Sequence, residues 1–205
     1  MLGERVEITP SLITGLIAVT LSIYSLVMFR EDLSIVVASI FFTLACTTDT
    51  FKCKIPNLLN ASLLITGMVL FTVNLGLPGL LLSLYGLGLG LALLLLPYIM
   101  GGIGAGDVKA LGALGALIGP YDLIHVFIYM GLYGGALALF HYCYKTNIKE
   151  NLREVWLSAC ASILTREVGY ITPPKPGSSK ASMRFPYSAA IALGYYSFVY
   201  WGGLL

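Results

Sequence analysis

A run of 52 residues without Asp, Glu, Lys or Arg, from Ile55 to Gly106, limits what this chain can fold into more than any other feature. A helix that crosses the hydrocarbon core of a bilayer needs roughly 20 apolar residues, so the run has room for about two crossings. The segment Asn74-Leu-Gly-Leu-Pro-Gly79 in its middle has the glycine and proline residues of a turn. Over the whole chain 11% of the residues are charged, against about 25% in soluble domains. The sequence therefore predicts an integral membrane protein.

The remaining uncharged runs predict further crossings. The expected fold is all-α, a polytopic helical membrane protein with about seven transmembrane helices. The fifth is the weakest, because Ala110 to Gly119 covers only about 15 Å at 1.5 Å per residue; if this segment is re-entrant, six crossings remain. The predicted spans are 8–29, 33–48, 58–77, 79–100, 108–120, 123–144 and 185–205.

The positions of Lys and Arg predict a cytoplasmic N-terminus, because basic residues gather on the cytoplasmic side of a membrane protein. With seven crossings, eleven of the twelve basic residues lie inside and only Arg30 lies outside. Without the fifth crossing, the seven basic residues of 145–184 would move outside, so the same pattern favours that crossing. The inside set is Arg5, Lys52, Lys54, Lys109, Lys145, Lys149, Arg153, Arg166, Lys175, Lys180 and Arg184.

We expect a single membrane domain, 1–205, in four parts. Residues 1–32 form an additional transmembrane anchor, which is retained because its length and its mixed charges do not fit a cleaved signal peptide. Residues 33–144 form the transmembrane core that carries the candidate catalytic residues. Residues 145–184 form a cytoplasmic amphipathic helix followed by a Pro- and Gly-rich linker, and residues 185–205 form the last transmembrane helix.

The cysteines and histidines predict no metal site. There is no Cys-x-x-Cys pair, so neither a zinc ribbon nor a disulfide framework is indicated, and the histidines have no carboxylate partner in sequence. We therefore expect no metal and no cofactor. The chain has no nucleic-acid footprint, and its basic inner surface favours anionic lipid headgroups. The residues concerned are Cys46, Cys53, Cys143, Cys160, His125 and His141.

Two aspartates stand at the membrane boundary on the same predicted side. Asp49 closes the second span and Asp107 opens the fifth, with two crossings between them. Two carboxylates held close together share one proton. The ionised one can take a proton from water, while the protonated one donates to a scissile carbonyl. The pair predicts aspartyl peptide hydrolysis; for Asp49 alone, a solvated inner loop with Lys52 and Lys54 is the alternative. Asp122 is expected to be a helix-start residue on the outer face.

Several neighbours of the aspartates are candidate supporting residues. Gly104 and Gly106 lack Cβ atoms, so the backbone before Asp107 can approach an extended substrate and adopt conformations that other residues avoid. Pro56 suits the first turn of the third span. Lys109 is a possible tuner of Asp107, although on a helix it would lie about 200° away from that residue.

At these positions the sequence resembles the type IV prepilin peptidase family, which are GxGD aspartyl membrane proteases. Asp49 followed by Lys52 and by Lys54-Ile-Pro56-Asn57 is similar to the family's first motif, and Gly104-Ala-Gly106-Asp107-Val-Lys109 is similar to its second. A third match, Pro186-Tyr with Gly194 eight residues after the proline, is similar to the opening of the family's last span. The resemblance covers about residues 38–205.

The resemblance implies that Asp49 and Asp107 are catalytic. It also implies cleavage of a short basic leader, commonly after a glycine, from type IV prepilin or pseudopilin precursors at the cytoplasmic face of the cell membrane. The cytoplasmic zinc domain of the larger, methylating members is missing, so only the peptidase activity is implied. The small size is similar to that of the Flp/Tad pilus peptidases, the CpaA/TadV type.

Three alternatives remain open from sequence. An archaeal preflagellin peptidase shares the chemistry and differs in its substrate. A transporter or channel would show internal repeats or broken helices with acids near mid-membrane, and neither is found in the sequence. A non-catalytic secretion scaffold would tolerate the loss of both aspartates. The expected partners are the precursor and membrane lipids.

Overall fold

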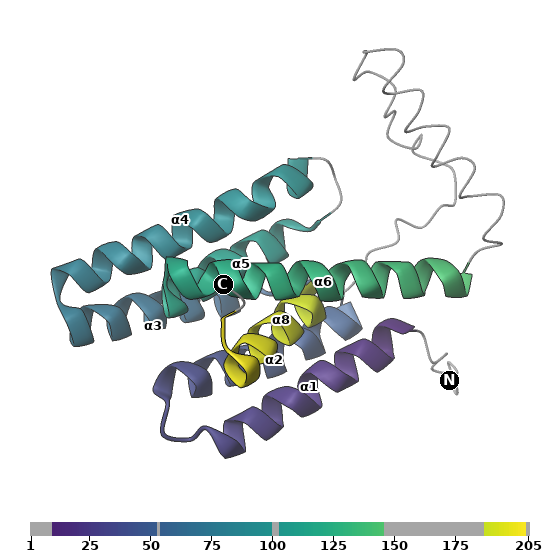
Figure 1. The fold of residues 1–205 in the computed structure, drawn as a ribbon, viewed down its shortest axis with the longest axis horizontal. Helices are drawn as coiled ribbons and strands as arrows, with labels where there is room; N and C mark the ends of the chain where they lie inside the picture. The colour runs from purple at the N-terminus through teal and green to yellow at the C-terminus, as the bar shows by residue number, and fades with distance from the viewer. Residues whose placement is uncertain (1–9, 53, 100–102, 146–186, 204–205) are drawn as a thin grey trace, which may run out of the picture. The chain divides into compact units, whose positions relative to one another are not determined.

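The computed structural model describes residues 10–52, 54–99, 103–145 and 187–203, which form seven α-helices and no strand within those ranges (Figure 1). The all-α prediction is confirmed for this part of the chain. The N-terminal nine residues and the predicted interfacial helix and linker at 146–184 lie outside the described residues. The helices are α1 (Pro10–Met28), α2 (Leu33–Lys52), α3 (Asn57–Leu75), α4 (Leu77–Ile99), α5 (Ala105–Ile118), α6 (Pro120–Lys145) and α8 (Tyr187–Trp201).

The helices follow the predicted spans to within a few residues. Three of them hold stretches long and apolar enough to cross a membrane, namely Leu33–Thr50, Asn57–Leu75 and Leu77–Ile99. The uncharged run therefore does form two spanning-length helices. The number of crossings and the side of the N-terminus stay predictions. One difference matters for the site: α2 continues to Lys52, so Asp49 lies inside its last turn and not in a loop.

The turn between α3 and α4 is tight because a glycine ends α3. Gly76 has φ 68°, and its N–H donates to the carbonyl of Thr72 at 2.8 Å. With ψ −146°, this positive-φ backbone is a conformation that residues with a Cβ disfavour, which explains the glycine at the end of the helix. α4 begins one residue later, so α3 and α4 form a helical hairpin.

The short helix α5 packs extensively against both α3 and α4. Nine of its residues are buried, among them every position from Ala110 to Leu117. A helix that is apolar on all sides is stable where neighbours cover every face. Glycines allow this close approach: a Cβ added to Gly86 would overlap the carbonyl of Gly115, and one added to Gly67 would lie 2.7 Å from the backbone nitrogen of Leu117. Packing between α3, α4 and α5 therefore fixes the start of α5, which carries Asp107.

A second group of helices consists of α1, α2 and α8, joined by the first half of α6. α8 packs against α6 at Gly194, where an added Cβ would meet the backbone of Met130. It packs against α2 through aromatic rings and through a hydrogen bond from Tyr196 to Ser39 at 3.2 Å. These helices belong to one compact unit, Met1–Gly135 with Phe185–Leu205. The second unit, Ala136–Arg184, is described only as far as the end of α6 at Lys145.

Two glycines of α4 provide a matched test of this packing. Gly86→Ala should destabilise the protein by about 1–3 kcal/mol, because the new methyl group overlaps the backbone of α5. Gly88→Ala should not destabilise the protein and should gain up to about 1 kcal/mol, because nothing lies within 4 Å of its added Cβ and alanine is the better helix former. Unfolding in detergent, followed by circular dichroism, measures both variants. Equal losses would contradict the close approach of α4 and α5.

Candidate active site

Asp49 is buried at the end of α2, with 8% of its surface exposed. The hydroxyl of Ser188, at the start of α8, donates a hydrogen bond of 2.5 Å to its Oδ2 atom. The backbone N–H of Ser188 donates to the same carboxylate. Because the first N–H groups of a helix have no partner within the helix, a carboxylate at that end satisfies them and is stabilised by the helix dipole. The alternative of a solvated loop for Asp49 is therefore wrong.

Asp107 lies in the first turn of α5 and is partly buried. Gly104 is the N-cap residue of this helix, and Asp107 is the third residue after it. The carboxylate accepts a hydrogen bond from the backbone N–H of Gly104, as the third residue does in a capping box. Asp107 is thus held by the start of its own helix, whereas Asp49 is held by the start of α8.

The two carboxylates interact electrostatically. Burial raises the pKa of Asp107 to about 7, and the negative charge of Asp49 is the second cause of this increase. Hydrogen bonds from the backbone N–H groups of Gly104 and Asp107 lower it in part. α2 and α5 are in direct contact, and the charge of Asp49 acts on Asp107, so the fold brings the two aspartates near one another. The result is a pair in which one carboxyl group stays protonated to about neutral pH.

The glycines before Asp107 do not need unusual backbone conformations. Gly104 has φ −79° and ψ 149°, an extended conformation open to any residue, and Gly106 lies inside the helix. The expectation of conformational freedom is therefore wrong for both glycines. What Gly104 supplies is space, because an added Cβ would lie 3.1 Å from Oδ2 of Asp107. At Gly106 the nearest atom, Cβ of Ile55, would be at 3.5 Å, an ordinary contact.

The other predicted supporting residues have varied positions. Lys109 is exposed, and its Nζ donates a hydrogen bond of 3.1 Å to Oδ1 of Asn57, which connects α5 to the start of α3. The ammonium group is therefore directed toward Asn57 and not toward Asp107. Pro56 is the N-cap residue of α3, one position before the predicted first turn. The side chain of Lys52 and the whole of Pro186 lie outside the described residues.

Sequence reasoning missed two polar residues of this site. Asn60, on α3, is 4% exposed, and its Nδ2 donates to the carbonyl of Gly106 at 3.1 Å. Its Oδ1 is buried without a hydrogen-bond partner. Ser188 is 2% exposed. Neither position stands out, because serine and asparagine within apolar helices have no local pattern that marks a contact made with a distant helix.

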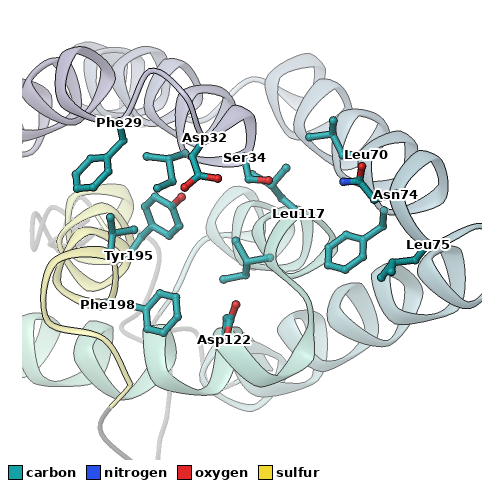
Figure 2. Close-up of a pocket in the computed structure, with 14 residues that line it drawn as sticks. Phe29, Asp32, Ser34, Leu70, Asn74, Leu75, Leu117, Asp122, Tyr195 and Phe198 are labelled. Carbon is teal, nitrogen blue, oxygen red and sulfur yellow. The ribbon is translucent and has the colours of Figure 1, made fainter.

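A cavity of about 470 Å³ lies at the start of α2 and the ends of α5 and α8, away from the aspartates (Figure 2). Neither Asp49 nor Asp107 lines it: α2 contributes Ser34 and Ile35, about 22 Å along the helix from Asp49 at 1.5 Å per residue. Asp122 does line it and lies in the first turn of α6, as expected of a helix-start residue. The cavity and the aspartate pair are therefore separate features. Among the described residues, no group of three His, Cys, Asp or Glu is placed to hold a metal ion.

Comparison with known proteins gives one match. Residues 36–139, about half of the chain, match the model of the type IV leader peptidase family. The matched range includes Asp49 and Asp107 and ends before α8. No curated protein and no solved structure was found to match the chain.

The interaction between the carboxylates is testable by titration. In wild type, Asp107 should titrate near pH 7. In Asp49→Asn, the pKa of Asp107 should be lower, because the neighbouring negative charge that favours the protonated form is removed. Asp122→Asn, which removes a carboxylate that lines the cavity, should leave it unchanged. Isotope-edited infrared spectroscopy of the carboxyl stretch, in lipid nanodiscs, measures the titration. An Asp107 that titrates near 4, or that ignores Asp49→Asn, would show that the two groups do not interact.

Proposed function

Because the chain belongs to the type IV leader peptidase family, we propose that it is a membrane aspartyl endopeptidase that removes the basic leader from type IV prepilin-like precursors, of the Flp/Tad pilin or pseudopilin class, at the cytoplasmic face. The observation that carries this proposal is the electrostatic coupling of Asp49 and Asp107, on two different helices, with one pKa raised to about 7. A pair in this state has both the base and the acid that peptide hydrolysis requires.

The proposed reaction uses one water molecule and no covalent intermediate. The ionised carboxylate takes a proton from the water as its oxygen attacks the scissile carbonyl carbon. The protonated carboxyl donates to the carbonyl oxygen, which gives a neutral tetrahedral diol. Collapse of the diol breaks the C–N bond and transfers a proton to the leaving amine, so the products are a carboxyl end on the leader and a free amine on the mature protein.

The exposure of the site suits a peptide substrate that approaches from the side of α5. Gly104 and Lys109 are exposed and Asp107 is partly so, whereas Asp49 is almost fully buried. A substrate backbone that approaches from this side would contact Asp107 first, and Asp49 would lie deeper in the site. The absence of a side chain at Gly104 leaves the edge of the carboxylate open.

Helix capping is the competing role for both aspartates, and substitution by Asn separates it from catalysis. An Asn side chain still accepts a hydrogen bond from a helix start but neither donates nor removes a proton in hydrolysis. We expect Asp49→Asn and Asp107→Asn to keep their thermal unfolding midpoints within a few degrees, and each to lose at least about 100-fold in cleavage rate.

The measurement is cleavage of a synthetic precursor, with a basic leader and a glycine before an apolar helix, reconstituted with the full chain in nanodiscs. Asp122→Asn is the control, since it removes an acid remote from the pair and should cleave at the wild-type rate. Full activity in either Asp49→Asn or Asp107→Asn would refute the aspartyl mechanism and leave a non-catalytic scaffold as the better interpretation.

The two glycines before Asp107 should differ in their tolerance of a methyl group. Gly104→Ala should lower kcat about tenfold or more, because the added Cβ presses on Oδ2 of Asp107 and displaces it from its working position. Gly106→Ala should lose less, because its added Cβ meets Ile55 at an ordinary distance. The same cleavage assay compares them, and a larger loss in Gly106→Ala would contradict this account of Gly104.

A further inference from the structure

Ser188 is the residue through which α8 reaches the aspartate pair. It is the second residue of α8, it is 2% exposed, and it lies 139 positions along the chain from Asp49. Its hydroxyl and its backbone N–H both donate to the carboxylate of Asp49. Two donors from one residue on one carboxylate restrict the rotamer of Asp49. They also favour its ionised form, against burial, which is the larger effect and favours the protonated form.

Asp107 has no such donor from another helix among the described residues. Its hydrogen bonds come from the backbone at the start of α5, and the charge of Asp49 acts against its ionisation. The two members of the pair therefore differ in their surroundings, although they belong to the same residue type. The charge of Asp49 acts on Asp107 and on the buried thiol of Cys46, one turn before it on α2.

From this asymmetry we infer that Ser188 is a positioning residue that holds Asp49 as the ionised general base and leaves Asp107 as the protonated general acid. The inference rests on the proposed peptidase function and deepens it, since it assigns the two roles. In the reaction, Asp49 accepts the proton of the attacking water while Ser188 stays hydrogen-bonded to its other oxygen. Asp107 donates its proton to the scissile carbonyl oxygen.

The test is the pH dependence of kcat/KM for Ser188→Ala in the full chain, reconstituted in nanodiscs with the synthetic precursor. Loss of the donor should lower kcat about 10–100-fold. It should also move the acidic limb of the profile to higher pH by about one unit, with the alkaline limb unchanged. Ser188→Thr, which restores a hydroxyl, should return the limb to its wild-type position. A loss of rate with no movement of the acidic limb, or movement of the alkaline limb, would overturn the assignment.

A matched control separates this result from general damage to α8. Ser197→Ala removes another buried hydroxyl of the same helix, whose hydrogen bond goes to Tyr133 at 2.8 Å, and it should leave both limbs in place. A shift in Ser197→Ala as large as that in Ser188→Ala would also overturn the assignment.

An infrared titration of the carboxyl groups gives a readout that does not depend on turnover. In Ser188→Ala, Asp49 should protonate at higher pH than in wild type, and an unchanged titration would overturn the inference. If either Asp49→Asn or Asp107→Asn retains full cleavage, it is the peptidase proposal that fails. If both are inactive while Ser188→Ala titrates as wild type, only the role of Ser188 is wrong.

Discussion

Two carboxylates are stable in this apolar protein because each accepts hydrogen bonds from the start of a helix. Asp49 lies against the first turn of α8 and Asp107 belongs to the first turn of α5. A buried charge without partners would cost several kcal/mol, and no cationic side chain is found beside either aspartate among the described residues. Backbone N–H groups supply the compensation without neutralising the acids. The arrangement therefore offsets the cost of burying the two acids and is compatible with the proposed pair of one ionised and one protonated carboxyl group.

The positions of the helix starts depend in turn on backbone packing. α5 is held between α3 and α4 by glycines whose missing Cβ atoms let the backbones touch, a form of association typical of membrane helices. Asn60 adds a hydrogen bond from α3 to the carbonyl of Gly106, directly before Asp107. Its other amide atom is buried and unpaired, which costs stability. An amide kept at such a cost is better explained by the position that it gives to the start of α5 than by a contribution to folding.

The sequence predicted the helices well because charge and turn residues mark their ends. The uncharged run, with a turn near Gly76, correctly predicted α3 and α4. The short apolar segment after Asp107 likewise predicted that α5 is shorter than its neighbours. Asp49 and Asp107 were found because acids stand out at the boundaries of apolar segments. The contacts of Ser188 and Asn60 were not predictable, since each depends on which faces of distant helices meet. The supporting role of Gly104 stays a prediction, and the reason given for it from sequence was wrong in part, because its ordinary φ is visible only in the fold.

Helix α8, whose first turn donates hydrogen bonds to Asp49, lies outside the region that matches the family model. Residues 36–139 contain both aspartates, the proline and asparagine that begin α3, and all of α5, but not Ser188. Within that region alone, Asp49 would end α2 without either of the donors that it receives from α8. The proposed reaction requires one base and one acid, and on the roles inferred for the pair it is the first turn of α8 that makes the two aspartates unequal. On that proposal Ser188 belongs to the site as much as the two aspartates do.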